Sequence, residues 1–531
     1  MGTVNINNAQ RSANYTKYDQ FHKIILGDII LEKELYSSWW DWKWRCGKIF
    51  AKCKAQRTIY TIEILNYKAK FTAMTYKGED AQHVWEEDFE LFAHTKNPGS
   101  FQLFGINQST IPMLIFHNEL IPLGHFYKYS FWSSLYLSHL TKNNKWESIR
   151  SVWKDMRGFL CGGPEGPNAD WKFFSSADGS LVVPKKADML KDDISFQFFC
   201  KIGSSMDNSI LKCAGFSQEP TYLDDLYLEV TKDLLSNDTE TPYYLYNLWQ
   251  NPCYYFPINI IGRLQFHTVY SPLKEAVARW PKGVYSLWEF VDWGQMGLVE
   301  KIVLSSGLTR FKLEMTQGKR ICLQAEYNWF KLRIAWLSQS SWVFNALGMN
   351  KGKENFFLIN PPHLMIHSAC NYDSLPFFDF YNHKYSNKKV LPPPIYLFVH
   401  PLPESISELV SWKNSQPYFW SFDETGQLEM SEEECERWRL PKLTPQTNGL
   451  AFLSSWPMHI YAALQDWQKA CGFNSTTSDW ARSMEYPELG IIGMTKSQGW
   501  FKEAANVQKE GKKKGSWWEA IAGSDISAFG F

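Results

Sequence analysis

Three acidic residues, Asp224, Asp225 and Glu229, have the spacing of a loose D-D-x-x-x-E motif. Two adjacent carboxylates and a third acid about one helical turn further on can share magnesium ions and hold a diphosphate group. Such enzymes also need a second metal motif, N-D-x-x-S-x-x-x-E, which neither 237–239 nor 371–374 matches. An acidic helix start, which the helix dipole favours, explains the same residues. We therefore expect no cofactor, with Mg²⁺ at these three acids as the alternative.

Two histidines, His363 and His367, lie four residues apart, with Asp379 and His383 further along the chain. On a helix, this spacing would let both imidazoles bind one metal ion. Two prolines precede His363, however, and the intervening Leu-Met-Ile is typical of a buried strand. In a strand the two histidines would lie about 13 Å apart. We expect a strand here and no metal site.

The stretch from Phe71 to Phe126 contains a regular order of predicted elements. A strand over 71–76 ends in the sequence Met74-Thr75-Tyr76-Lys77-Gly78, and a charged helix follows over 79–95. After the turn Asn97-Pro98-Gly99 come a strand over 101–105 and a second strand over 113–120. We expect a five-stranded antiparallel sheet with one helix for residues 57–120, in which 57–65 is a further strand rich in β-branched residues.

This order resembles the small lobe of a protein kinase, whose central strand ends in the pattern K-x-Y-x-G. Met74 then stands where the phosphate-anchoring lysine is expected, and Asp88 stands where a glutamate would pair with that lysine. The resemblance makes four residues hinge-like: Phe116, His117, Asn118 and Glu119. A thioether carries no charge and donates no hydrogen bond, so Met74 cannot hold nucleotide phosphates. We expect Asp88 to point toward Met74 without a cationic partner from the same strand.

Other parts of a kinase site are missing from the sequence. No glycine occurs between Gly47 and Gly78, so no glycine-rich loop precedes the strand, and neither an H-R-D nor a D-F-G motif follows. Phosphoryl transfer without these groups loses both its positioning and its charge stabilisation. The sequence therefore predicts that the chain is not an active protein kinase and that ATP binding is weak or absent.

Several later segments resemble a large family of fungal proteins with the same degenerate kinase-like start; they are 104–126, 306–311, 329–345, 392–401, 417–426 and 461–484. The resemblance implies a fungal origin and a kinase-like first domain. It supplies no catalytic residue, because no activity is attached to these motifs.

Composition limits the class of protein. The chain of 531 residues has 55 basic and 55 acidic side chains, so an extended nucleic-acid surface is not expected. Ten cysteines occur without a C-x-x-C pair, and no apolar run of roughly 18 residues is present. The polar N-terminus does not resemble a signal peptide. These features predict a cytoplasmic protein without a membrane span. The 25 tryptophans are scattered, which favours a role in cores and domain contacts.

The predicted fold class is α+β: a kinase-small-lobe-like antiparallel sheet plus helix, followed by a mixed, mainly helical remainder. The expected parts are a disordered N-terminus (1–20), a kinase-like domain (21–140), a mixed central region (141–383), a linker (384–394), a small α+β domain (395–495) and a tail (496–531). Within them we expect helices over 22–54, 145–158, 328–347 and 460–470, and a capping box at Ser431 and Glu434.

Two functions fit these features. The first is a non-catalytic, pseudokinase-type scaffold that binds protein partners. The alternative is an enzyme of fungal specialised (secondary) metabolism that acts on a small apolar or diphosphate substrate in an aromatic-lined pocket. Asp224, Asp225 and Glu229 are its candidate residues.

Overall fold

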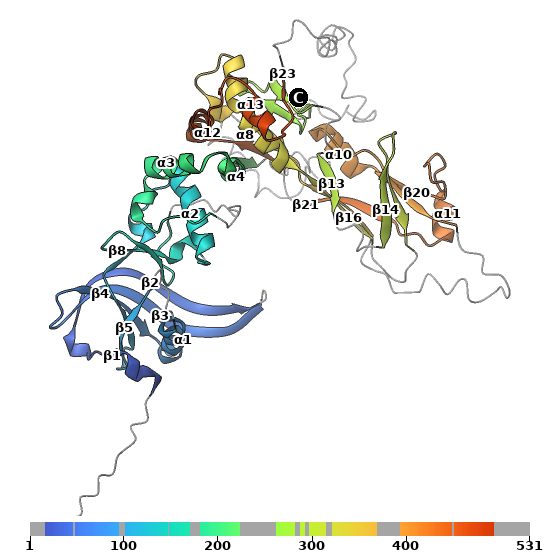
Figure 1. Cartoon of the computed structure of the whole chain (residues 1–531). Coiled ribbons are helices and arrows are strands. Elements are labelled where there is room, and N and C mark those ends of the chain that lie inside the picture. The colour runs from blue at the N-terminus through green and yellow to red at the C-terminus, as the bar shows by residue number, and fades with distance from the viewer. Residues whose placement is uncertain are drawn as a thin grey trace, which may run out of the picture. The chain divides into compact units, whose positions relative to one another are not determined.

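The computed structural model describes residues 16–45, 48–94, 101–146, 148–169, 181–222, 262–281, 287–291, 297–314, 321–368, 393–448 and 451–492. The chain forms two compact units, Met1–Ser217 with Ala462–Gly472 and Gln218–Tyr461 with Phe473–Phe531. Each unit combines helices with mainly antiparallel sheets (Figure 1), which confirms the α+β class. None of the helices in the described ranges is long and apolar enough to cross a membrane.

A six-stranded sheet begins the first unit, in the order β1-β5-β6-β4-β3-β2. Its strands are β1 (His22–Lys23), β2 (Ile29–Arg45), β3 (Lys48–Ile64), β4 (Lys70–Lys77), β5 (Leu103–Asn107) and β6 (Met113–Phe116). All neighbours are antiparallel except β1 and β5, and the helix α1 (Ala81–Ala93) follows β4. The order strand, helix, strand, strand agrees with the expectation for 57–120. The sheet has six strands where 57–120 was expected to supply five: β3 to β6 are four of them, and β1 and β2 come from the preceding segment.

The helix expected over residues 22–54 is wrong. This segment forms β2 and the first part of β3, which pair as a long antiparallel hairpin from Ile29↔Ile64 to Arg45↔Lys48. Apolar and polar residues alternate in the sequence of the last part of β2, 40–45, and alternation of this kind is typical of a strand. Pairing with β3 provides partners for the backbone hydrogen-bonding groups on one side of β2. These contacts outweigh the local preference of the segment for a helix.

The body of the sheet has an apolar cluster on each face. On the face that α1 covers, Met74 and Ile59 of the sheet belong to one apolar cluster with Val84, Trp85 and Phe89 of the helix. On the opposite face, Ile62, Ile64, Phe71, Ala73, Phe104 and Ile115 form a second cluster. β4 is buried at all of its inner positions, since it contributes alternate residues to both clusters.

The first unit continues with a three-stranded sheet of β7 (Leu120–Pro122), β8 (Val152–Asp155) and β9 (Leu160–Gly162). Three helices follow or precede its strands: α2 (Phe131–Asn143), α3 (Asp192–Ile202) and α4 (Asp207–Phe216). The helix expected over 145–158 is wrong, because β8 lies there between β7 and β9. Trp153 is fully buried in β8, and its indole donates to the carbonyl of Pro164 at 2.9 Å.

Four small sheets make up the strands of the second unit. Two of the sheets have three strands: β10 (Glu219–Tyr222), β22 (Phe452–Ser455) and β17 (Leu358–Asn360) form one, and β11 (Thr268–Tyr270), β12 (Ala276–Arg279) and β23 (Gly490–Ile491) form the other. The third sheet consists of β13 (Trp288–Val291), β16 (Cys322–Tyr327), β18 (His363–Ser368) and β21 (Leu443–Asn448). The fourth consists of β14 (Leu298–Val303), β15 (Thr309–Leu313), β19 (Tyr396–Val399) and β20 (Tyr418–Ser421). Strands from 395–448 therefore share sheets with strands from 298–368. The second unit contains most of the expected C-terminal domain together with 218–383 of the expected central region, whereas 141–217 and Ala462–Gly472 belong to the first unit. Residues 384–392 lie outside the described residues.

The remaining helices are α8 (Trp329–Ala346), α10 (Ile406–Asn414), α11 (Glu432–Arg437), α12 (Met458–Ala470) and α13 (Asp479–Ser483). Asn328 caps α8 by accepting from the amide of Lys331, and Ser431 and Glu434 form the expected capping box of α11. α12 ends before Gly472, whose φ of 82° suits glycine. Among the described residues after 140, both helices and strands occur, as the α+β class requires.

Candidate functional site

Met74 lies in the middle of β4 and is fully buried. Its side chain belongs to the apolar cluster beneath α1, together with Trp85 and Phe89. A thioether suits such a place because it is apolar and adapts its shape to its neighbours. The position that the resemblance assigns to a phosphate-anchoring lysine is therefore part of the core.

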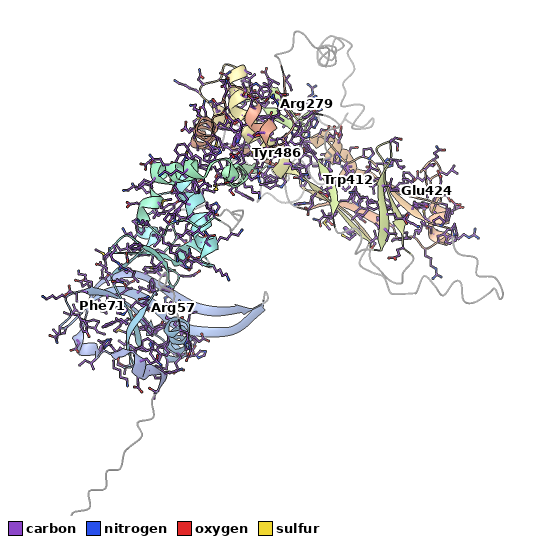
Figure 2. The ribbon with its side chains drawn as sticks, viewed as in Figure 1. Arg57, Phe71, Arg279, Trp412, Glu424 and Tyr486 are labelled. Atoms are coloured by element: carbon purple, nitrogen blue, oxygen red, sulfur yellow. The ribbon has the colours of Figure 1, made fainter. Side chains whose placement is uncertain are left out.

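The side chain of Asp88 points from α1 toward the sheet face that this helix covers, and two side chains of the sheet bind it. The guanidinium Nη2 of Arg57 donates to Oδ2 at 2.6 Å, and the hydroxyl of Tyr76 donates to the same oxygen at 2.7 Å. Arg57 on β3 and Tyr76 on β4 are directly opposite each other in the register. Both side chains of the ion pair are less than a tenth exposed. Arg57 (labelled in Figure 2) thus brings a cation to Asp88 from the strand next to β4.

Sequence reasoning placed Asp88 near Met74 but did not find Arg57. On β4 the hydroxyl of Tyr76 binds Asp88, and the cation comes from Arg57 on β3. Arg57 stands at the start of the strand predicted over 57–65, and its pairing with Tyr76 follows only from the register of β3 and β4.

Burial controls the electrostatics of this group. Burial raises the pKa of Asp88 above its ordinary value, although Arg57 and the hydroxyl of Tyr76 act in the opposite direction. Burial also raises the pKa of Tyr76 well above 10, so the phenol stays protonated and donates. The three residues form a hydrogen-bonded network inside the core. Its cation is already neutralised by Asp88, so it has little capacity to hold a phosphate.

The hinge-like residues do not form one continuous strand. Phe116 ends β6 and is fully buried, and His117, Asn118 and Glu119 lie in the turn before β7. Asn118 has a φ of 70°, a left-handed conformation that asparagine tolerates. Burial lowers the pKa of His117, whose ring packs edge-on against Phe104 with 4.9 Å between centroids.

Thr72 on β4 bonds to the backbone of this turn. Its hydroxyl donates to the carbonyl of Asn118 at 3.1 Å and accepts from the amide of Leu120 at 2.9 Å. Thr72 is fully buried, so both bonds are sheltered from water. A ligand that approached the turn would find these two backbone groups already bonded.

The remaining candidates divide into two sets. Asp224, Asp225, Glu229, Asp379 and His383 lie outside the described residues. His363 and His367 lie on β18, which pairs with β16 and β21, so the strand prediction is confirmed. His367 Nε2 lies 2.9 Å from the side-chain oxygen of Gln446. Within the described ranges, no three His, Cys, Asp or Glu side chains come together as metal ligands.

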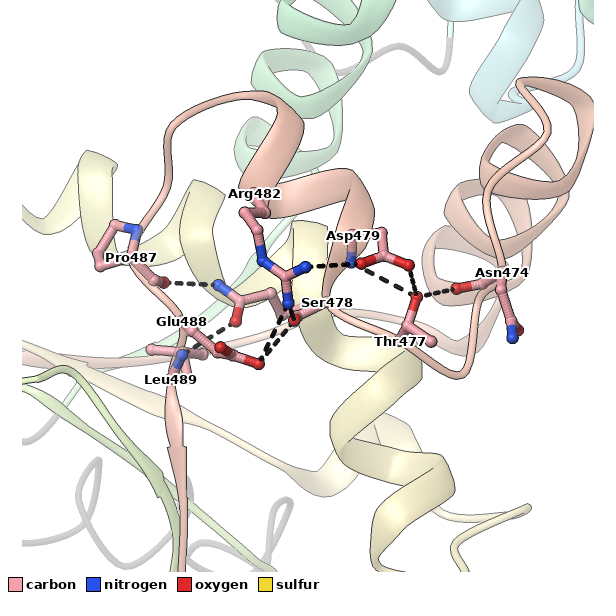
Figure 3. Close-up of polar contacts among 9 residues, drawn as sticks. Asn474, Thr477, Ser478, Asp479, Arg482, Pro487, Glu488 and Leu489 are labelled. Atoms are coloured by element: carbon pink, nitrogen blue, oxygen red, sulfur yellow. Dashed lines mark hydrogen bonds and ion pairs between the residues drawn. The ribbon is translucent and has the colours of Figure 1, made fainter.

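A polar cluster in the second unit joins α8 to residues 474–489 (Figure 3). Gln339 of α8 is fully buried, and its amide nitrogen donates to the carbonyl of Pro487 at 2.9 Å. Its amide oxygen accepts from the backbone amide of Leu489, also at 2.9 Å. One side chain thus fastens the extended segment that leads into β23. We call residues 339 and 474–489 the Gln339 clasp.

The Gln339 clasp also contains charged side chains that are exposed to solvent. Arg482 donates to Asp479 at 2.9 Å and to the hydroxyl of Ser478 at 3.1 Å. Ser478 in turn donates to Glu488 at 2.7 Å (Figure 3). Arg482, Asp479 and Glu488 are about half exposed or more, so these ion pairs orient the loop without forming an enclosed site. The Asp-Trp-Ala-Arg motif, whose Trp480 is buried, therefore serves the fold.

Comparison with known proteins assigns no family to the chain. No protein-family profile matches the sequence, and no curated protein matches it. The resemblance to a kinase small lobe and to the fungal family stays a prediction, and the functional argument rests on the residues described above.

Proposed function

We propose that this chain is a non-catalytic, kinase-like scaffold that binds other proteins. The observation that carries the proposal is the buried ion pair between Arg57 and Asp88. Asp88 stands where the resemblance puts the glutamate that pairs with the phosphate-anchoring lysine, yet its cation comes from Arg57 on the neighbouring strand, and the pair is buried and bonded to Tyr76. The pair stabilises the contact between α1 and the sheet.

Phosphoryl transfer needs groups that the first unit uses for other purposes. A free cation must face the phosphates, and metal ligands and a base must surround the reacting oxygens. The charge of Arg57 is compensated by Asp88 at 2.6 Å, and Met74 is neutral. Thr72 bonds two backbone groups of the hinge-like turn, which reduces what that turn offers to a nucleotide base.

Apolar side chains exposed at one end of the first sheet support a role in protein contacts. Ile25, Ile30 and Leu65 are 65%, 55% and 57% exposed, respectively. They lie close along the chain to the point where β2 begins and β3 ends, and the amide of Leu65 donates to the carbonyl of Asp28. Exposed apolar groups that gather in one region are typical of docking surfaces.

A thermal-shift titration of the full chain with ATP and magnesium tests the proposal. A ligand that binds only the native state stabilises it by RT ln(1 + [L]/Kd), so a protein without a nucleotide site should show a change in Tm below about 1 °C at millimolar ATP. Magnesium chloride alone and sodium triphosphate serve as controls for effects of the ions. A rise of several degrees at sub-millimolar ATP that needs magnesium would contradict the proposal.

A further inference from the structure

Residues 16–24 form an arm that adds to the first sheet at the edge of β5. The strand β1 within this arm runs parallel to β5, with His22 opposite Gly105 (Figure 1). The amide of Ile24 donates to the carbonyl of Ile106 at 3.0 Å. The arm is thus held as a short edge strand by backbone hydrogen bonds.

Aromatic side chains of the arm pack on α1. The ring of Tyr18 lies 5.7 Å from that of Trp85 and 4.9 Å from that of Phe89, measured between centroids. The ring of Phe21 meets Phe89 edge-on at 5.4 Å. Both helix side chains are almost fully buried, and the arm is part of their cover. We call the surface that α1 and β5 offer to these residues the arm site.

Gly105 makes room for the arm. A Cβ atom at this position would lie 2.7 Å from the carbonyl oxygen of His22 and 3.2 Å from Cγ1 of Ile24. A methyl group cannot come so close to a backbone oxygen unless one of the two strands shifts. The arm site is therefore shaped for an extended backbone that lies directly on β5.

Residues 25–28, which we call the strap, join the arm to β2. β1 and β2 are the two edge strands of the six-stranded sheet, so five strand spacings, about 24 Å in a flat sheet, would separate them. The six Cα–Cα steps from Lys23 to Ile29 span at most about 22 Å, and a 3₁₀ turn over Leu26–Asp28 shortens the path further. Ile24 and Ile29 both pack against the apolar cluster opposite α1, so the strap crosses that face. The strap closes because the sheet is curled, and it has little slack.

Exposed apolar side chains surround the strap. Ile25 and Leu26 lie in the strap, Ile30 and Leu31 follow in β2, and Leu65 comes directly after β3; each is at least two fifths exposed. In a single copy of the chain this apolar surface faces water. A second copy, related by a two-fold axis near the straps, would cover it.

We propose that two copies of the chain exchange arms, so that the arm of each copy occupies the arm site of the other. The two straps and the exposed apolar side chains around them then pack against each other. Each copy regains from its partner every contact that its own arm gave up, and the covered apolar surface is a net gain. A short connection favours such an exchange over closure within one copy. The inference rests on the interaction function proposed above and names a second copy of the chain as the partner.

A segment of a different protein fits the arm site less well. It would have to displace an arm that is tethered beside the site at an effective concentration of about 1 mM. The displaced arm, with Tyr18 and Phe21, would then be left without a binding site. The apolar side chains around the strap would also stay uncovered. A second copy avoids all of these losses.

Photo-crosslinking of the full chain tests where the arm binds. p-Benzoylphenylalanine in place of Tyr18 reacts on irradiation with the side chains next to it, which belong to α1. An arm bound within its own copy gives a single chain of unchanged mass, whereas an exchanged arm joins two chains on a denaturing gel. We expect a covalent dimer in which the arm is joined to Ala81–Ala93, and a dimer mass by light scattering at concentrations on the order of 10 µM.

Two variants with matched controls separate arm exchange from other contacts. Insertion of Gly-Ser-Gly-Ser after Gly27 keeps every arm contact but lengthens the strap, and should raise the Kd of the dimer at least about tenfold. The same insertion after Leu428, an exposed residue of the second unit, should leave this Kd unchanged. Gly105→Ala should weaken both the crosslink to α1 and the dimer. Gly490→Ala should change neither, because its added methyl group meets its nearest atom at 3.8 Å.

A chain that stays monomeric at these concentrations would overturn the proposal. So would a dimer whose arm crosslinks only within its own copy, or one whose Kd does not respond to the insertion after Gly27. The ATP titration is read separately, so a nucleotide site and a failed arm exchange are distinguishable.

Discussion

At the scale of single residues, Arg57 and Asp88 depend on each other. Both are buried, and a buried charge whose partner is removed costs far more than an exposed one. We expect Asp88→Ala to lower the free energy of unfolding by about 3 to 5 kcal/mol, since it leaves the guanidinium of Arg57 without its carboxylate and removes a bond of Tyr76. Urea denaturation followed by circular dichroism measures the loss.

Two further variants separate the ion pair from general damage to α1. Glu90 also lies on α1, but its ion pair with Lys17 is exposed, so Glu90→Ala should stay close to wild type. The double variant Arg57→Met, Asp88→Leu removes both charges and should recover much of the stability that Asp88→Ala loses. An Asp88→Ala protein as stable as the wild type would show that the pair does not hold the helix to the sheet.

At the scale of elements, Gln339 connects α8 to the segment that enters β23. Its amide makes two bonds to backbone groups of that segment, one to Pro487 and one to Leu489. Gln339→Leu keeps a similar volume but leaves a backbone amide and a carbonyl without this partner, which should cost about 2 kcal/mol. In the Gln339→Leu variant, hydrogen exchange at the amide of Leu489 should also be faster than in the wild type.

Gln82→Leu is the matched control, because Gln82 lies on α1 with an exposed bond to Glu86. It should change neither the urea midpoint nor the exchange of Leu489. If Gln339→Leu also left both measurements unchanged, the Gln339 clasp would not be what fastens the segment before β23.

At the scale of the whole molecule, the first unit is built from two distant stretches of chain. Ala462–Gly472 belongs to it together with the first 217 residues. Trp467 from this second stretch is fully buried, and its indole donates to Asp207 of α4 at 2.6 Å. It also contacts Trp132 of α2, with 5.9 Å between ring centroids.

A fragment of residues 1–217 should therefore be less stable than the same unit in the full chain. It would expose the apolar surface of α2 and α4 that Trp467 covers, and loss of one large buried aromatic side chain costs about 3 to 5 kcal/mol. Trp467→Ala in the full chain should destabilise the first unit by a similar amount, and Trp467→Phe by less. Thermal unfolding of the fragment and both variants tests this; a fragment as stable as the intact unit would contradict it.

Elements that depend on nearby residues could be predicted from the sequence. α1, α8, α11 and α12 carry their own signals: an apolar face at helical spacing, the capping box at Ser431 and Glu434, and the stop at Gly472. The strand order around Met74 and the place of Asp88 on its helix also follow from short-range order. Residues involved in such signals are only a few positions apart, so one stretch of sequence contains all of them.

Only the tertiary structure decided what depends on strand pairing. The segments 22–54 and 145–158, which the sequence predicts as helices, contain strands, because strand pairing decides their conformation and part of it involves residues outside each segment. The same holds for the site: Arg57 reaches Asp88, and Thr72 reaches the turn at Asn118, through the register of β4 with its neighbours. Register is set by the packing of whole faces, which no single segment encodes. The sequence by itself therefore determined that Met74 cannot anchor a phosphate, and the fold decided which residues occupy its surroundings.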